Sequence, residues 1–248
     1  MSVLVFCGAD GGVGVTTSLV AIGAHWRTTS AAVVEMNRRG GNLAAWAGIP
    51  DNVGTATLSA ACWNGNPDDL VSAQWGTLSN GLPVLCGPTR QAAGSGVVDH
   101  IAAKVLHTAA HSGSALLVDA GTLDANNLPQ WINTADAIVV VAKQDPRSAP
   151  VTGARLERVA ELVDATRSIG IETFALTVGE QPFKAREVAS FLDVTTIAVV
   201  CDPIGAALLT RRDANPRSVG RCALVRSALE PAERLAIVIA ANPIAASI

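Results

Sequence analysis

The sequence contains no tyrosine, few charged residues and no apolar run long enough to cross a membrane. Charged residues make up 16% and hydrophobic residues 49% of the 248 positions, a balance that excludes a disordered chain. The formal net charge of −3 gives no general reason to expect nucleic acid as a partner. The best candidate for a membrane span, residues 235–248, is interrupted by Asn242-Pro243 and falls short of the roughly 20 residues that a spanning helix needs. The first residues carry no basic region, so we expect no secretory signal and a cytoplasmic protein.

Cysteine is also scarce, and its pattern does not suggest disulfides. The five cysteines are odd in number and widely spaced, and none of them forms a Cys-x-x-Cys pair. We therefore expect reduced thiols that pack as small hydrophobic side chains. The cysteines are Cys7, Cys62, Cys86, Cys201 and Cys222.

What the sequence does contain is an alternation of short apolar runs with longer alanine-rich stretches. The runs predict strands at 3–7, 32–34, 83–85, 115–118, 137–141, 171–178 and 197–200. Helices are predicted at 16–27, 97–111, 148–169, 184–191, 203–210 and 219–240, and the stretch 48–80 is less regular. Several strands are continuously apolar, which is typical of strands covered on both faces. We expect one α/β domain over residues 1–248, with a doubly wound, mostly parallel sheet of about seven strands.

A glycine-rich turn follows the first predicted strand and leads directly into a helix. It reads Gly8-Ala9-Asp10-Gly11-Gly12-Val13-Gly14-Val15-Thr16-Thr17. A strand, a glycine turn and a helix N-terminus together place backbone N–H groups around a concave site that suits a phosphate. The alternative is a tight turn with no ligand. Thr16 opens the helix and is a candidate cap or Mg²⁺ ligand.

At this turn the chain resembles the ParA/MinD class of P-loop ATPases. The segment Gly11-Gly12-Val13-Gly14-Val15-Thr16-Thr17 resembles their deviant Walker A loop, which reads Lys-Gly-Gly-x-Gly-Lys-Thr-Thr. Four further segments match in the family's order: 33–43 (second strand and switch I), 115–121 (Walker B and switch II), 137–146 (the next strand and its loop) and 200–203 (the late loop near the nucleotide base). The likeness is greatest to degenerate members, namely pilus localisation proteins of the TadZ/CpaE type and actinobacterial MinD-like proteins.

The resemblance implies a fold, a ligand and partners. The fold is a three-layer αβα domain with the P-loop after the first strand. The ligand is ATP or ADP with Mg²⁺, bound by Gly11, Gly12, Val13, Gly14, Val15, Thr16 and Thr17, with Thr16 and Asp119 as metal ligands. A homodimer and a protein partner at the switch-region face are also implied. For Asp119, the alternative is a polar residue that simply ends a buried strand.

The departures from the family pattern concern charge. Val15 and Asp10 stand where the family has its two loop lysines, the second of which crosses a dimer interface to the partner's phosphates. A unit charge about 4 Å away is worth about 4 kcal/mol at an effective dielectric of ~20, and a carboxylate in place of a cation reverses the sign. We therefore expect any dimer interface not to be closed by two sandwiched ATP molecules. Arg38 and Arg39 in the switch I segment are candidates to replace the lost charge.

Switch I departs from the family as well. The family usually has two acidic residues there, whereas this chain has Glu35 and Asn37. An amide cannot act as a general base, and phosphoryl transfer depends on positioning and on positive charge around the γ-phosphate. The sequence thus favours a pseudo-ATPase that acts as a localisation or scaffold protein, with weak or absent ATP or ADP binding and little hydrolysis.

Two alternatives stay open. One is a slow Mg-dependent ATPase of the MinD/ParA type, acting in positioning, partition, or pilus or secretion assembly. The other is a partition protein that binds DNA without sequence preference through basic side chains. The candidate residues for that contact are Arg211, Arg212, Arg217, Arg221 and Arg226.

Three further features have ordinary explanations beside functional ones. His100, His107 and His111 share one face of the predicted helix 97–111, which favours a solvated polar face over a zinc site. Trp46, Trp63 and Trp75 flank the irregular stretch; core filling is the default, and a protein-binding surface the alternative. The segment after Asn242-Pro243 carries no basic residue, so direct membrane targeting by an amphipathic helix is not expected.

Overall fold

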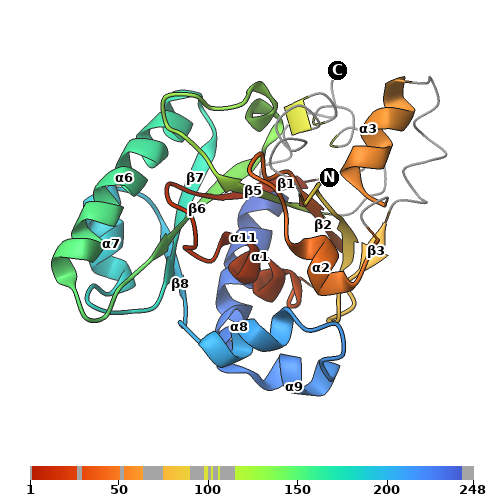
Figure 1. The fold of residues 1–248 in the computed structure, drawn as a ribbon. Helices are drawn as coiled ribbons and strands as arrows, with labels where there is room; N and C mark the ends of the chain where they lie inside the picture. The colour runs from red at the N-terminus through yellow and green to blue at the C-terminus, as the bar shows by residue number, and fades with distance from the viewer. Residues whose placement is uncertain are drawn as a thin grey trace.

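The computed structural model describes residues 2–26, 30–50, 53–63, 75–89, 98–99, 102, 106 and 115–241. Its centre is an eight-stranded sheet in the order β3-β4-β2-β5-β1-β6-β7-β8 (Figure 1). The strands are β1 (Ser2–Gly8), β2 (Ala31–Glu35), β3 (Gly76–Thr77), β4 (Pro83–Leu85), β5 (Ala115–Thr122), β6 (Ala137–Lys143), β7 (Glu172–Val178) and β8 (Thr196–Val199). All neighbouring pairs are parallel except β3 with β4.

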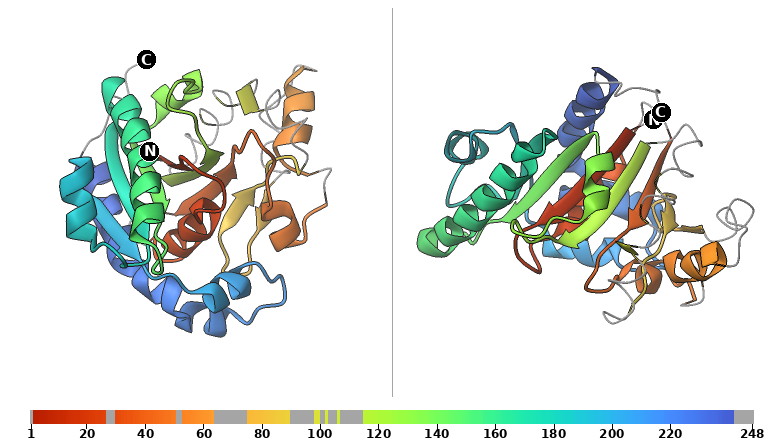
Figure 2. Two further views of the ribbon diagram at one scale, coloured as in Figure 1. Left: turned by 60° about the vertical axis from the view of Figure 1, so that its left-hand side comes forward. Right: turned by 90° about the horizontal axis from the view of Figure 1, so that it is seen from above.

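Helices cover both faces of this sheet, which gives three layers (Figures 1 and 2). One face carries α1 (Val15–Gly23), α2 (Leu43–Ala47), α8 (Pro203–Leu209), α9 (Pro216–Arg221), α10 (Ala223–Ser227) and α11 (Leu229–Ala241). The other carries α3 (Thr55–Trp63), the 3₁₀ turn η2 (Gln130–Thr134), α6 (Ala149–Ser168) and α7 (Ala185–Leu192). The fold class expected from the sequence is therefore confirmed.

Alternation along the central strand explains why the sheet is covered twice. Leu4 and Phe6 point into the core on the α1 side, whereas Val3, Val5 and Cys7 point into the core on the α6 side. Successive side chains of a strand lie on opposite faces, so a strand that is apolar at every position needs a helical layer on each side.

The seven expected strands are all present, and one strand was missed. The two-residue strand β3 is antiparallel to β4 and lies within the irregular stretch 48–80. A pair of residues such as Gly76 and Thr77 carries no periodic signal that a sequence pattern can detect. The predicted helix 97–111 and its three histidines lie almost wholly outside the described residues; Val98, Asp99, Ala102 and Leu106 are helical.

The prediction of one continuous helix over 219–240 is wrong. The chain there forms the end of α9, then α10 and α11, with Cys222 extended between the first two. Pro231 has no N–H group and is accommodated only in the first turn of α11. Tertiary hydrogen bonds hold the preceding break, because Asp202 accepts the Leu224 N–H at 3.3 Å and Ser227 Oγ accepts the Val200 N–H at 3.0 Å.

The cysteines follow the expectation only in part. Cys7 and Cys86 are buried, and burial raises the pKa of each thiol to about 12, which makes both unreactive. Cys201 is exposed and Cys222 is partly exposed, and all four are free thiols. Among the described helices, none is both long and apolar enough to span a bilayer.

Candidate functional site

The candidate site lies where the carboxyl ends of the central parallel strands meet. β1 has β5 on one side and β6 on the other, so the connections leave the sheet in opposite directions next to it. In open α/β sheets a crevice forms at such a reversal of strand order. The glycine-rich loop connects the end of β1 to α1 at this point (Figure 1).

The loop has the backbone shape that an anion requires. Gly12 and Gly14 have φ of 73° and 93°, and Gly14 is the N-cap of α1, a helix with no acidic side chain in its first turn. Left-handed residues next to a helix N-terminus turn successive N–H groups toward one centre, and the helix dipole adds positive potential there. The predicted phosphate cradle therefore has the right local geometry.

Apolar packing holds the loop in this shape. Val13 and Val15 are buried and belong to the core on the α1 side. A Cβ atom on Gly8 would come within 2.6 Å of Val13 Cγ2, so only glycine lets the loop fold back over the end of β1. Val15 thus replaces the family lysine with a core side chain and leaves no cation at that position.

Thr16 and Asp119 are brought together, as the sequence predicted. The Thr16 hydroxyl donates to Asp119 Oδ2 at 2.5 Å, and the Gly121 N–H donates to Asp119 Oδ1 at 2.9 Å. Asp119 is fully buried, and burial raises the pKa of its carboxyl while these two hydrogen bonds act in the opposite direction. Both hydrogen bonds satisfy the buried carboxylate of Asp119 at the end of β5.

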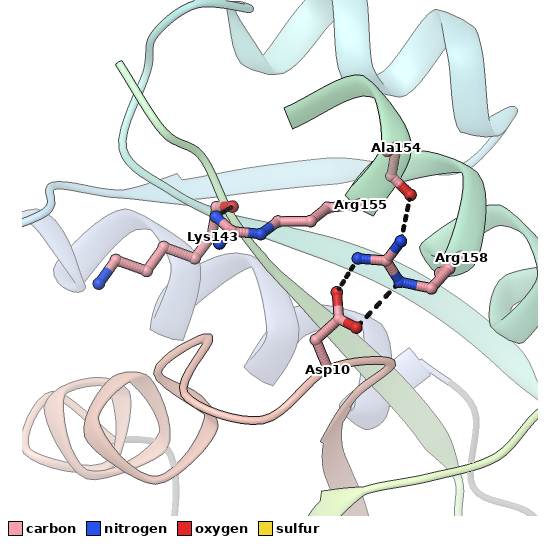
Figure 3. A network of polar contacts seen from close by, with 5 residues as sticks. All are labelled: Asp10, Lys143, Ala154, Arg155 and Arg158. Atoms are coloured by element: carbon pink, nitrogen blue, oxygen red, sulfur yellow. Dashed lines mark hydrogen bonds and ion pairs between the residues drawn. The ribbon is translucent and has the colours of Figure 1, made fainter. Parts of the chain in front are cut away.

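Asp10 has a partner that the sequence did not reveal. Arg158 of α6 donates from Nε to Asp10 Oδ1 at 2.9 Å and from Nη2 to Oδ2 at 2.8 Å, and Nη1 donates to the Ala154 carbonyl (Figure 3). A bidentate guanidinium largely cancels the field of the carboxylate at the cradle. The expectation that Asp10 reverses the charge of the loop is therefore revised, because the pair as a whole is neutral.

The carboxylate of Glu35 is held by backbone N–H groups and is not free. It is buried, and its oxygens accept the N–H groups of Asn42 at 2.8 Å, Leu43 at 3.2 Å and Gly87 at 2.9 Å. These contacts join the switch I segment to the end of β4. Burial, and secondarily the charge of Asp119, raise the pKa of Glu35 to about 7.

The other switch I side chains are also engaged. Asn37 accepts the Arg39 N–H at 2.9 Å, and its amide packs so closely on Gly121 that a Cβ atom there would overlap it. Arg38 donates to Asp99 at 2.7 Å. In this structure Arg38 is thus paired with Asp99, and the role of Arg38 and Arg39 as substitutes for the loop lysines stays a prediction.

A cavity of about 310 Å³ opens beside the loop. Part of its wall is the loop and the start of α1, and another part is apolar. It is lined by Gly12, Val13, Gly14, Thr17, Ser18, Lys143, Val178, Val200, Cys201, Asp202, Pro203, Ala206 and Leu224. Of the predicted ligand-binding residues, Gly12, Val13, Gly14 and Thr17 reach it, whereas Gly11, Val15 and Thr16 do not.

Sequence reasoning missed Lys143 as a member of the site. The usable signal was its position at the carboxyl end of a predicted central strand, where polar side chains of α/β proteins converge on a ligand. The late loop at 200–203 was expected near the ligand and does line the cavity.

A matched pair of glycine substitutions tests the shape of the cradle. In Gly14→Ala the side chain meets no close neighbour but must adopt φ near 93°, which costs roughly 1–2 kcal/mol. Gly11→Ala, with open space around its Cβ and no positive φ, should leave stability almost unchanged. Urea denaturation of both variants measures the difference, and equal stability would contradict the geometry.

The raised pKa of Glu35 predicts how the free energy of unfolding depends on pH. Because its pKa is raised from 4.5 to about 7 in the fold, the folded state holds a proton that the unfolded state has lost between these values. The free energy of unfolding should therefore fall as pH rises from about 4.5 to 7, with a slope of at most about 1.4 kcal/mol per pH unit for this group.

Denaturation at a series of pH values in Mg-free buffer measures that slope. Glu35→Gln should reduce it, and the exposed Glu161→Gln should leave it unchanged. The slope is the readout, since the amide also changes absolute stability at every pH. An undiminished slope in Glu35→Gln would contradict a buried, proton-holding Glu35.

Comparison with known proteins identifies the fold. No model of a known protein family matches the chain, and no curated protein sequence matches it. Among solved structures, a ParA family ATPase from Chlorobium tepidum is similar with a TM-score of 0.74 and 14% identity, over 94% of this chain and 98% of that one.

Two structures that contain MinD are similar over almost the whole length of the matching chains. A chain of the MinC:MinD cell division protein complex from Aquifex aeolicus gives a TM-score of 0.69 at 14% identity, over 100% of this chain and 99% of that one. MinD from Pyrococcus horikoshii, complexed with Mg-ADP, gives 0.68 at 15% identity, over 96% and 98%. Identities this low establish the fold and no more, so the conclusion is that this chain has the fold of the ParA and MinD ATPases.

Proposed function

We propose that the protein is a ParA/MinD-fold scaffold or localisation factor whose P-loop binds a nucleotide weakly and hydrolyses it little. It would act through protein–protein contacts at its switch-region face. The fold of the neighbours supports the general class, in which a P-loop site and protein association occur together. The MinC:MinD complex is an example of such an association for that MinD.

The observation that carries this proposal is that the groups expected to activate water are already engaged. Both oxygens of Glu35 accept backbone hydrogen bonds, and Asn37 is tied to Arg39 and packed on Gly121. A general base must be within hydrogen-bond reach of the attacking water, and releasing Glu35 would leave the buried N–H groups of Leu43 and Gly87 unpaired. Among the described residues of switch I, no carboxylate is free for that role.

The charge around the cradle supports the same proposal. Val15 contributes no cation, and Arg158 is held by Asp10 at the outer side of the loop. Stabilising a transferring phosphoryl group needs fixed positive charge at its equatorial oxygens. With the loop lysines absent, a bound γ-phosphate would gain little of that stabilisation.

Magnesium fits the donors that are present. Thr16 and Asp119 offer a hydroxyl and a carboxylate within hydrogen-bond distance of each other. Mg²⁺ is usually held by one or two such protein groups, with phosphate oxygens and water completing the octahedron. The bound ion would neutralise phosphate charge, whereas Thr16 and Asp119 would fix its position at the start of α1.

A dimer of this protein would differ from an ATP-sandwich dimer. The loop residue at the signature position is Asp10, which is paired within its own chain by Arg158. No loop cation is therefore offered to a partner subunit. We propose that any homodimer forms without two shared ATP molecules at the interface.

Hydrolysis measurements test the proposal. Wild type should show no Mg-dependent ATPase activity above background, measured as phosphate release. Val15→Lys returns a cation to the loop but gives up the core packing of Val15. Compared with Val15→Met, which gives up the same packing, it should strengthen ATP binding without restoring turnover, because Glu35 stays engaged. Val15→Met controls for side-chain length without charge.

One result would favour the alternative of a slow ATPase. Saturable Mg-dependent phosphate release by wild type, abolished in Asp119→Ala, would mean that the site still performs catalysis. In that case the engaged switch I groups are rearranged when nucleotide binds, and the scaffold assignment fails.

A second candidate function is sequence-independent DNA binding, and one observation favours it. The five arginines between 211 and 226 are all exposed. Arg211 pairs with Asp213 at 3.0 Å, and in the described part of the chain the other four form no ion pair. Arg217 and Arg221 are four residues apart on α9 and share one face.

Duplex binding at several salt concentrations tests this candidate. If the surface binds DNA, Arg217→Glu with Arg221→Glu should weaken binding and lower the salt slope by about 0.9 for each DNA phosphate that is no longer neutralised. The exposed pair Arg147→Glu with Arg186→Glu is the matched control of charge. Equal weakening in both double variants would reflect net charge alone, and absence of duplex binding by wild type would end the DNA hypothesis.

A further inference from the structure

Lysine is rare in this chain, and one of its lysines lies at the P-loop cavity. Only three of the 248 residues are lysine: Lys104, Lys143 and Lys184. Lys143 lines the same cavity as Gly12, Gly14 and Thr17. A lysine in that place is notable in a chain that has lost both loop lysines of the family it resembles.

The sheet fixes the position of the Lys143 backbone. Lys143 is the last residue of β6, the strand next to β1, and it is in register with Val178 of β7. Arg155 donates from Nη1 to the Lys143 carbonyl at 3.3 Å, so α6 holds the end of this strand. The side chain extends away from Asp10 and Arg158 in Figure 3.

The ammonium of Lys143 has no ion-pair partner among the described residues, unlike the guanidinium groups of Arg158 and Arg38. Arg158 is bound to Asp10, and Arg38 is bound to Asp99. Lys143 forms no ion pair with any described residue. Within the described residues that line the cavity, it is the one cationic side chain.

We propose that Lys143 is the phosphate-binding cation of this P-loop, in place of the absent loop lysine, and that the ligand is a nucleoside diphosphate. The inference rests on the nucleotide-binding part of the proposed function. It assigns the cation to β6, the strand beside the loop, rather than to the loop itself. The N–H groups at Gly12 and Gly14 and the Lys143 ammonium would share the phosphate oxygens.

The remaining walls of the cavity define the rest of the ligand. Val178, Val200, Pro203 and Leu224 contribute apolar surface to the same cavity. The oxygens of Asp202 accept the N–H groups of Gly205 and Leu224, which holds this carboxylate at the start of α8. A cavity that combines the loop N–H groups and Lys143 with apolar surface suits a nucleoside with a short phosphate chain.

Among the described residues that line the cavity, no second cationic side chain is available to a third phosphate. Thr16 and Asp119 do not line the cavity. On the outer side of the loop, the Asp10–Arg158 pair contributes no net charge. ATP should therefore bind no more tightly than ADP.

Calorimetric titration with ADP tests the role of Lys143. Lys143→Met keeps the length of the side chain and removes its charge, and should weaken ADP binding about tenfold or more, the range of a lost charge-assisted hydrogen bond. Lys143→Arg should restore part of the affinity. The control is Lys184→Met, which removes an exposed lysine at the start of α7 and should leave ADP affinity unchanged.

Three further titrations separate the parts of the ligand. Adenosine should bind equally to wild type and Lys143→Met, because it carries no phosphate. The affinity for inorganic pyrophosphate should fall in Lys143→Met by the same factor as the affinity for ADP. Wild type should bind pyrophosphate more weakly than ADP. If wild type binds the two ligands equally tightly, the apolar wall of the cavity has no role in binding. ATP binding tenfold tighter than ADP would overturn the diphosphate assignment.

Cys201 provides an independent readout of the ligand's position. It is exposed and lines the cavity, so bound ADP should slow its alkylation by iodoacetamide, followed by mass spectrometry. At the same ADP concentration Lys143→Met should show less protection. ADP binding that leaves Cys201 unprotected would place the ligand elsewhere and overturn the proposal, provided that circular dichroism shows all variants folded.

The outcome separates this inference from the proposed function. ADP affinity that is the same in wild type and Lys143→Met overturns the role of Lys143 and leaves the absence of hydrolysis untouched. Wild type that binds no ADP at millimolar concentration also overturns it. Efficient ATP hydrolysis overturns the scaffold function, and Lys143 is then judged by its own titrations.

Discussion

Apolar packing under the loop between β1 and α1 is the constraint on which the site depends. Val13 and Val15 are buried in the core, and Gly8 leaves room for the loop to fold back over the strand. The left-handed glycines 12 and 14 then present the N–H groups. Because this shape needs no charged side chain, both loop lysines can be lost while the cradle persists. The backbone shape of a P-loop and the charge of its side chains are therefore separable properties.

Charge around the cradle has been rearranged rather than removed. Asp10 is neutralised by Arg158 from α6, and Lys143 approaches the cavity from β6. Both partners come from elements that pack on the same part of the sheet. The position of a charged side chain at a strand end is fixed by the sheet, whereas the position of a loop lysine depends on the loop conformation. In our proposal, a positive charge at the phosphate site therefore comes from a strand end rather than from the loop.

The carboxylates near the cradle serve the fold. Glu35 links two loops because its oxygens accept three backbone N–H groups. Both oxygens of Asp119 also accept hydrogen bonds, from the Thr16 hydroxyl and the Gly121 N–H. A buried carboxylate with such partners is costly to release, since each abandoned N–H would be left unpaired. Structural use and catalytic use of these groups compete, and in this conformation the structural use prevails.

The sequence by itself determined every strand except β3, the three-layer class and the place of the glycine-rich loop, because these follow from local patterns of apolar residues and glycine. It also placed Thr16 and Asp119 together through the resemblance to a known family. Only the tertiary structure decided which charges meet, since Asp10 and Arg158 are 148 residues apart and no local pattern joins them. The same holds for Lys143 at the cavity and for the helix broken near Cys222, where contacts with distant residues outweigh local helix propensity.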